Sequence, residues 1–462
     1  MPIVTTPAHV ARPSGLRRRA LPTGVPSEPQ DRPGGVAALF VVLALLLYSG
    51  AARPVLELMG AGAAGGRARV ISWPIYLILS VLALSHAGDF IRAAWRGKAA
   101  LLFGAFAVAS VAWSTVPSVT ARRGLSLVMA TLLGLYFVVR FNERERLRMV
   151  CWTLGAAAVL SLIVGTVAPS IGRMPDDASW RGVFIHKNVL GKTMALSVGA
   201  FLLLAQDRGR RRWLALAGAG VSFVLLLLSR SVSALLIGVT IAAVTPLLRS
   251  VRLSHVRHLG ILIAAVIVAE AIVLGVYFEW ESMLTLLGRD PTLTGRTDLW
   301  LEVLGLIQRR PWLGYGLGGF WLGWEGESAA VWSALGWRPP HAHNGLLDIT
   351  LDLGMVGLAL FLAGYVAAWT KALWAARSAS SLNGLWALMF LTFLVLSETT
   401  ESALLAQNSL MWVLYVATVA GLIPSDRIAS TPSRLHGALG PLSLGVRRRL
   451  GQRGRTQPGP GQ

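Results

Sequence analysis

The sequence contains few charged residues, and most of them carry one sign. Of its 462 residues only 14% are charged whereas 54% are hydrophobic, and 43 Lys and Arg outnumber 22 Asp and Glu. A water-soluble protein of this length could not bury so much apolar surface. The scarcity of charge therefore excludes a soluble enzyme and indicates an integral membrane protein.

Cysteine and internal symmetry are also scarce. Cys151 is the only cysteine, which excludes an internal disulfide. No A-x-A cleavage site follows the basic and apolar N-terminal stretch, so we predict a retained first span and not a signal peptide. The sequence shows no repeat of about 20–50 residues and no obvious inverted halves, which disfavours the common transporter designs.

The sequence is rich in long apolar runs. A helix needs about 20 mostly apolar residues to cross a bilayer. We predict an all-α polytopic membrane protein of about twelve spans with a large loop before the tenth. The spans are expected near 36–52, 70–86, 99–116, 124–140, 149–168, 189–206, 212–229, 231–248, 259–279, 345–369, 382–397 and 404–423.

Basic residues gather in alternate loops, as in "GLRRRA", "RFNERERLR" and "DRGRRR". Because loops rich in Lys and Arg stay in the cytoplasm, both termini are predicted to be cytoplasmic. The positive charge is also suited to anionic membrane lipids. A nucleic-acid partner is not expected, because the basic residues are scattered over many loops.

These patterns divide the chain into five segments. Both ends are rich in Pro, Gly, Arg and Ser, which is typical of disorder. The segments are a disordered basic cytoplasmic N-terminus at 1–33, spans one to nine at 34–279, a large extracytoplasmic loop at 280–344, spans ten to twelve at 345–425, and a disordered basic cytoplasmic tail at 426–462.

Positive charge is normally rare on the outer side of a membrane protein, but several cations lie there in the predicted topology, among them Arg173 and the four candidate site residues Arg181, Lys187, Arg230 and Arg296. Cations at the hydrocarbon boundary are costly to leave unpaired. Each could pair with a nearby aspartate or with ordinary lipid phosphates. As a set they favour a phosphorylated lipid ligand, because guanidinium groups bind phosphate in bidentate fashion.

The large loop is rich in tryptophan: Trp300, Trp312, Trp321, Trp324, Trp332 and Trp337. Two interpretations stay open for these rings, an interfacial belt at headgroup depth and apolar walls for sugar rings. The segment "GYGLGGF" at 314–320 lacks the Lys-Ser/Thr of a phosphate-binding loop, so its glycines predict a tight re-entrant backbone.

The stretch "HAHNGLLDITLDLGMVG" at 341–357 places histidines directly before the tenth span. His341 and His343 have no third ligand at a recognisable spacing, so we predict no metal. Asn344 is either a plain helix N-cap or a supporting residue of the site. Asp348 and Asp352, four residues apart, are expected to orient His343 or to pair with an arginine.

Several segments together resemble the family of O-antigen ligases and Wzy-type polysaccharide polymerases. The family pattern H-[NSQ]-x9-G-x-x-[GTY] matches His343–Asn344 and Gly354–Gly357. The segments "AWSTVPSVTARRGLSLV", "WRGVFIHKNVLG", "SRSVSALL", "GRTDLW" and "PWLGYGLGGF" are similar to other family segments. The resemblance runs from about Val111 to Gly357, and exopolysaccharide polymerases are the most similar subgroup.

The resemblance implies an enzyme at the periplasmic face of the bacterial inner membrane that uses neither metal nor nucleotide cofactor. It would move a glycan from undecaprenyl diphosphate to a saccharide hydroxyl, alongside a flippase and a chain-length regulator. Positive charge must stabilise the leaving diphosphate, which suits Arg181, Arg230 and Arg296 with Lys187 as support. The general base is expected to be His343, with Asn188, Asn344 and Asp348 supporting it.

The sequence leaves two alternatives open. A lipid-linked glycan flippase or another polysaccharide transporter would also be polytopic, but its ionisable residues should lie near midplane in several spans. A polymerase and a ligase share the donor and the leaving group, and they differ only in the acceptor.

Overall fold

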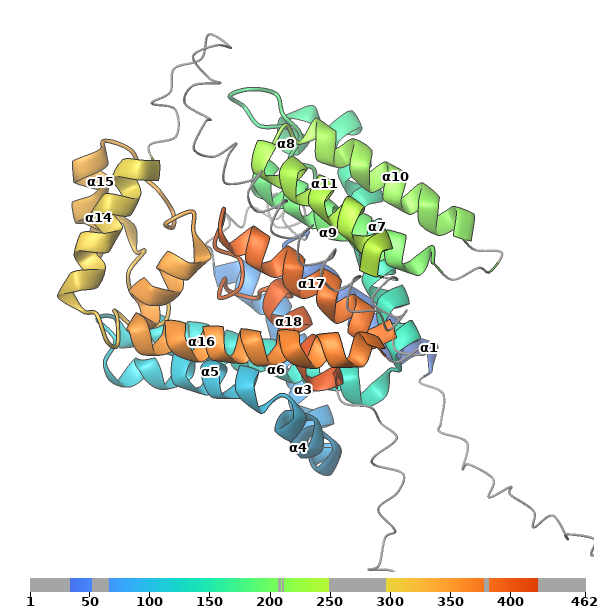
Figure 1. Cartoon of the computed structure of the whole chain (residues 1–462). Coiled ribbons are helices and arrows are strands. Elements are labelled where there is room, and N and C mark those ends of the chain that lie inside the picture. The colour runs from blue at the N-terminus through green and yellow to red at the C-terminus, as the bar shows by residue number, and fades with distance from the viewer. Residues whose placement is uncertain are drawn as a thin grey trace, which may run out of the picture. The chain divides into compact units, whose positions relative to one another are not determined.

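The structure, a computed structural model, describes residues 34–51, 66–206, 209, 212–248, 296–377 and 382–422. In these ranges the chain is helical, and the strand-like pairing they contain is one isolated bridge between Arg173 and Trp180. The elements (Figure 1) are α1 Gly35–Tyr48, α3 Gly66–Ser85, α4 Ala87–Arg96, α5 Lys98–Ala109, η1 Ser110–Ala112, α6 Pro117–Arg140, α7 Glu143–Val167, α8 Pro169–Gly172, α9 Lys187–Leu204, α10 Arg212–Leu228, α11 Val232–Leu247, α14 Arg296–Arg309, η4 Gly323–Glu325, α15 Ser328–Leu335, α16 Gly345–Arg377, α17 Leu382–Glu398 and α18 Leu410–Gly421.

The described part of the chain is all-helical, and the protein is a multi-pass membrane protein. Helices α6, α7, α9 and α16 are long and apolar enough to cross a bilayer, and α3 with α4 forms a fifth candidate that bends by 95°. Each expected span within the described residues coincides with an apolar helix, but α1, α5, α10, α11, α17 and α18 are shorter than 18 residues. The number of about twelve spans stays a prediction, and the span near 259–279 and both termini lie outside the described residues.

Helix α9 carries the first half of the candidate site, and it packs against α7, α10, α11 and α17. Small residues make this close packing possible, as expected for helices in a membrane. A Cβ atom at Gly199 would lie only 2.6 Å from the side chain of Ile241 on α11. The backbone of α9 is therefore held tightly between its neighbours.

Helix α16, which follows the histidines, is broken at Gly354. This residue has φ 67° and ψ −172°, a conformation in the left-handed half of the map that favours glycine. The backbone groups released by the break bond to the preceding loop: Met355 N to Pro311 O at 2.7 Å, Val356 N to Trp312 O at 3.3 Å, Tyr315 N to Leu351 O at 2.9 Å, and Gly316 N to Asp352 O at 2.8 Å. The loop backbone thus satisfies groups that the helix leaves unpaired.

The glycine-rich segment 314–320 adopts the tight backbone that its sequence predicts. Gly314, Gly316 and Gly318 all have positive φ. The amide of Gly318 donates to Asp352 Oδ2 at 2.8 Å, and a side chain at Gly318 would collide with Arg123 of α6. These contacts fix the end of the large loop against α16 and α6.

Candidate active site

The turn that carries the two histidines is shaped by its own backbone and by the cap of α16. His343 has a left-handed φ of 51°. Asn344 Oδ1 accepts the amides of Leu346 at 3.0 Å and Leu347 at 3.2 Å. Asn344 is therefore the N-cap of α16, the plainer of its two expected roles. The cap fixes the direction in which the chain passes from His343 into α16.

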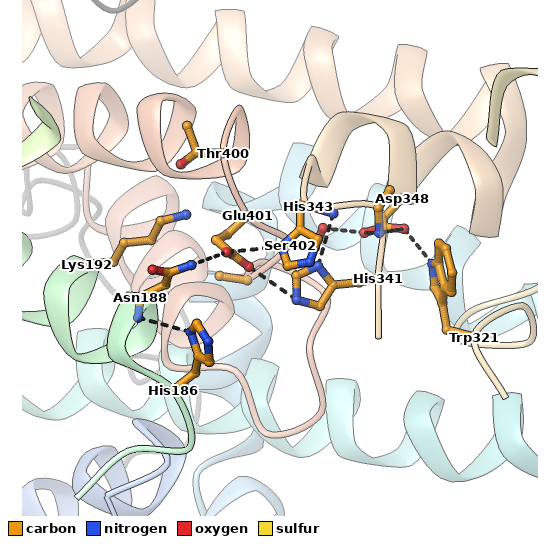
Figure 2. A network of polar contacts seen from close by, with 12 residues as sticks. His186, Asn188, Lys192, Trp321, His341, His343, Asp348, Thr400, Glu401 and Ser402 are labelled. Atoms are coloured by element: carbon orange, nitrogen blue, oxygen red, sulfur yellow. Dashed lines mark hydrogen bonds and ion pairs between the residues drawn. The ribbon is translucent and has the colours of Figure 1, made fainter. Parts of the chain in front are cut away.

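Glu401, in the connection between α17 and α18, joins both histidines to two other elements (Figure 2). Its Oε1 lies 3.2 Å from His343 Nδ1, and its Oε2 lies 3.2 Å from His341 Nε2. Asn188 of α9 donates from Nδ2 to Oε1 at 2.9 Å. Arg296, at the start of α14, reaches the same oxygen at 3.8 Å. The Glu401 side chain is only 13% exposed, so these groups largely replace its water.

The hydrogen bonds define which ring nitrogens carry protons. His341 Nδ1 accepts the backbone amide of His343 at 3.1 Å, so its Nε2–H donates to Glu401. The Nδ1–H of His343 donates to Glu401 Oε1, because an ionised carboxylate can only accept. His343 Nε2 is therefore left with its lone pair. An imidazole in this state can accept a proton.

The environment keeps Glu401 ionised and His341 neutral. Burial alone would raise the pKa of Glu401, but the hydrogen bond from His343 and the positive charge of Lys192 hold this pKa well below its ordinary value. Burial lowers the pKa of His341 to about 4, and the opposing effect of Glu401 is weaker. Near neutral pH the cluster thus consists of a carboxylate and a neutral His341.

We expect this neutral His341 to make the stability of the protein depend on pH. The folded pKa of about 4 lies below the ordinary 6.5, so the unfolded chain binds one more proton in that interval. The contribution is fully present above pH 6.5 and is lost as the pH falls toward 4. Thermal unfolding in detergent between pH 4 and pH 7.5 should therefore show a shallower slope for His341→Gln than for the wild type.

A matched control is His86, which is exposed at the bend between α3 and α4. His86→Gln should retain the slope of the wild type. Equal slopes for the wild type and His341→Gln would show that His341 is not held neutral by the fold.

Asp348 does not orient His343, contrary to one of its expected roles. It accepts Trp321 Nε1 at 2.7 Å, the amide of Ala342 at 3.1 Å, and the hydroxyl of Ser402. Asp348 therefore ties the histidine turn to the connection that carries Glu401. Glu401 takes the orienting role because its loop, and not the next turn of α16, faces the imidazole.

Asp352 is also directed away from His343. Its Oδ2 accepts the amide of Gly318, beside Arg123 of α6. Asp352 was expected either to orient His343 or to pair with an arginine. The first expectation is wrong, and the position of Asp352 next to an arginine of a neighbouring helix agrees with the second.

The predicted cations fall into two groups. Arg296 lies at Glu401, whereas Lys187 and Arg230 meet at Asp177: Lys187 Nζ is 2.5 Å from its carboxylate, and Arg230 donates to its carbonyl oxygen at 3.2 Å. Arg181 in the same loop donates from Nε to the carbonyl of Ile171 at 2.9 Å. Pairing with a nearby aspartate, the plainer expectation, is thus observed for Lys187.

The start of α9 connects the two groups. Lys187 and Asn188 are its first residues, and His186 caps it by accepting the amide of Asn188 at 3.2 Å. Burial lowers the pKa of His186, and both Glu401 and Asp177 lie near enough to oppose this shift. The N-terminus of α9 therefore lies between Glu401 and Asp177.

The structure supplies the third potential metal ligand that the sequence spacing lacks. Ligand atoms of His341, His343 and Glu401 all lie within 4.8 Å of one another. These atoms are hydrogen-bonded to each other directly, and the cations Arg296 and Lys192 act on the same carboxylate. Nearby positive charge opposes a second cation, so the hydrogen-bonded arrangement explains the cluster without an ion.

The tryptophans of the large loop divide into three sets. Three of them use the indole N–H to hold the loop backbone or Asp348: Trp300 to Ala342 O at 2.9 Å, Trp321 to Asp348 Oδ1 at 2.7 Å and Trp332 to Pro339 O at 2.9 Å. Trp337 stacks on His343 with 6.2 Å between ring centroids. Trp312 and Trp324 are 69% and 56% exposed, and the belt and sugar-wall interpretations both stay open for them.

Glu401 is the main residue that the sequence reasoning missed. The signal was present as two acids, Glu398 and Glu401, between the last two predicted spans. Acids at a helix boundary need partners, but the sequence does not show that the connection of α17 and α18 faces a turn almost 60 residues earlier. Glu398 accepts the amides of Ala403 and Leu404 and holds that connection in shape.

Comparison with known proteins confirms the resemblance. Residues 183–362 match the family described as O-antigen ligase. The exopolysaccharide production protein ExoQ of Rhizobium meliloti is 29% identical over 272 residues, which cover 56% of this chain and 61% of ExoQ. Proteins of Rickettsia conorii and Rickettsia prowazekii, described as candidate polysaccharide ligases, are 38% and 39% identical over 79 residues, or 16% of this chain and 19% and 20% of theirs. The chain thus matches less than two thirds of the length of these relatives.

Proposed function

We propose that this O-antigen-ligase-like membrane protein transfers a glycan from undecaprenyl diphosphate to a hydroxyl of a saccharide acceptor, at the periplasmic face of the bacterial inner membrane. The observation that carries the proposal is the pairing of His343 with the partly buried Glu401, beside Arg296. The arrangement combines an oriented base with a phosphate-binding cation. Both a polysaccharide polymerase and a polysaccharide ligase would catalyse such a transfer.

In the proposed reaction His343 Nε2 takes the proton of the acceptor hydroxyl as its oxygen attacks the anomeric carbon of the donor sugar. The new glycosidic bond forms while the bond from this carbon to the phosphate oxygen breaks. The electron pair of the broken bond leaves with undecaprenyl diphosphate. Glu401 stabilises the imidazolium that results, because its Oε1 accepts the Nδ1–H of His343.

The leaving diphosphate gains negative charge in the transition state, and cations placed there stabilise it. Arg296, Arg181, Arg230 and Lys187 are proposed for this role. The N-terminus of α9 adds the positive end of its helix dipole on the same side as Lys187. The lipid diphosphate is itself an activated leaving group, so the proposal includes no nucleotide and no metal.

The proposal places the active site outside the cytoplasm. We expect cysteines introduced at Gly209 and Ser254 to be shielded from a membrane-impermeant maleimide in intact spheroplasts, and one at Gly326 to react. The native Cys151 is buried, so it should give no background. Comparing the labelling before and after permeabilisation shows on which side of the membrane each introduced cysteine lies. A shielded Gly326→Cys that reacts only after permeabilisation would place the site in the cytoplasm and contradict the proposal.

The function itself is tested with purified protein in proteoliposomes. The donor is the lipid-linked oligosaccharide extracted from cells that lack this protein, with the same pool as acceptor. We expect longer saccharides and an equal amount of free undecaprenyl diphosphate. Movement of unaltered donor between leaflets, without release of undecaprenyl diphosphate, would indicate a flippase. Elongation of lipid-linked chains would indicate a polymerase, and transfer only to an added second acceptor a ligase.

A further inference from the structure

Glu401 is bound from three separate parts of the chain besides its own, which is more than an orienting partner of one histidine requires. Asn188 comes from α9, Arg296 from α14, the two histidines from the turn before α16, and the carboxylate itself from the connection of α17 and α18. The carboxylate is thus shared between the base and one of the cations proposed for the diphosphate.

The contacts of this carboxylate are unequal. Asn188, His341 and His343 approach Glu401 to 2.9–3.2 Å, within ordinary hydrogen-bond distance. Arg296 stays at 3.8 Å, too far for a strong hydrogen bond. Its side chain is 23% exposed, so a ligand can reach it. Arg296 is therefore the partner that Glu401 can release most easily.

Phosphate is a better partner for Arg296 than this carboxylate. A diphosphate offers bidentate, charge-assisted hydrogen bonds to a guanidinium, whereas Glu401 offers one oxygen that already accepts from Asn188 and His343. A bound diphosphate would neutralise Arg296. The charge of Glu401 would then act on His343 with less opposition and stabilise the imidazolium more strongly.

We propose that Glu401 is the positioning residue of His343 and that its ion pair with Arg296 restrains the base until the donor diphosphate takes Arg296 over. This inference rests on the proposed function and deepens it, because it makes donor binding the event that strengthens the base. Glu401 and the diphosphate then compete for one guanidinium.

Glu401→Gln separates the two roles. The amide keeps the shape of the side chain but cannot stabilise an imidazolium, so we expect kcat to fall roughly 10²–10³-fold, somewhat less than for a serine-protease triad that loses its carboxylate. Arg296 loses its competitor, so undecaprenyl diphosphate should bind about two- to fivefold tighter, the contribution of one weak ion pair. Glu401→Asp retains the charge and should restore part of kcat.

The comparator is Glu398→Gln. Glu398 is buried at the end of α17, and the hydrogen bonds described for it come from the amides of Ala403 and Leu404 and not from a histidine. Its replacement should lower the thermal stability without tightening the binding of undecaprenyl diphosphate. If Glu401 only stabilised the fold, Glu401→Gln would likewise lower the thermal stability without tightening the binding of undecaprenyl diphosphate.

The measurements are kcat with extracted lipid-linked donor and the Kd of undecaprenyl diphosphate in detergent solution. Lower kcat together with tighter binding supports the inference. Wild-type kcat in Glu401→Gln, or lower kcat with weaker or unchanged binding, would overturn it while transfer by the wild type still stands. An absence of transfer by the wild-type protein would instead refute the proposed function.

Discussion

Replacing Arg296 or Arg181 with alanine is expected to reduce glycan transfer by at least about 10²–10³-fold, the usual effect of removing one group that stabilises transition-state charge. The diphosphate leaves with added negative charge, and Arg296 lies 3.8 Å from the carboxylate that holds His343. Arg181 comes from the loop where Lys187 and Arg230 meet at Asp177. The variants should still insert and accumulate, because neither arginine fills the apolar core.

Lysine should restore only part of the activity at either position, since an ammonium cannot reproduce the bidentate fork of a guanidinium. Arg309 is a matched control, because it is exposed in the last turn of α14, the helix that begins with Arg296. Arg309→Ala should transfer at the wild-type rate. Full activity of both Arg296→Ala and Arg181→Ala at equal membrane levels would refute the diphosphate-binding role.

His343→Ala is expected to lower the transfer rate roughly 10²–10⁴-fold, the range of a positioned proton transfer. Its Nδ1–H is bound by Glu401, so only Nε2 is left to accept the acceptor proton. The affinity for donor should change little, because the cations are unaltered.

The neighbouring histidine gives the contrast. His341 uses both ring nitrogens in hydrogen bonds, one to the amide of His343 and one to Glu401, so it has no lone pair for the acceptor. His341→Ala should be much milder than His343→Ala. A chelator should leave the wild type active, and a loss of activity that a divalent metal restores would show that the cluster works as a metal site.

The sequence was sufficient for the helical class and for the start of α16. Apolar runs identify the helices, and Asn344 caps α16, which was one of its two expected roles. The break of α16 at Gly354, which has a positive φ, falls inside the span expected at 345–369 and was not predicted.

The partners of these residues could not be obtained in the same way. Glu401 reaches His343 across 58 positions, and Asn188 reaches Glu401 across 213. Such contacts depend on how α9, α16 and the connection of α17 and α18 pack together. The spacing of Asp348 suggested an orienting role only because residues of one helix are the neighbours that a sequence can show.

The most direct test of the account is a single-turnover measurement with purified His343→Ala. The protein is preincubated with saturating lipid-linked donor, acceptor is added, and free undecaprenyl diphosphate is followed with elongated saccharide. We predict that the two products appear together and roughly 10²–10⁴ times more slowly than with the wild type, at unchanged donor affinity. Appearance of both products at a near wild-type rate would contradict the assignment of His343 as the base.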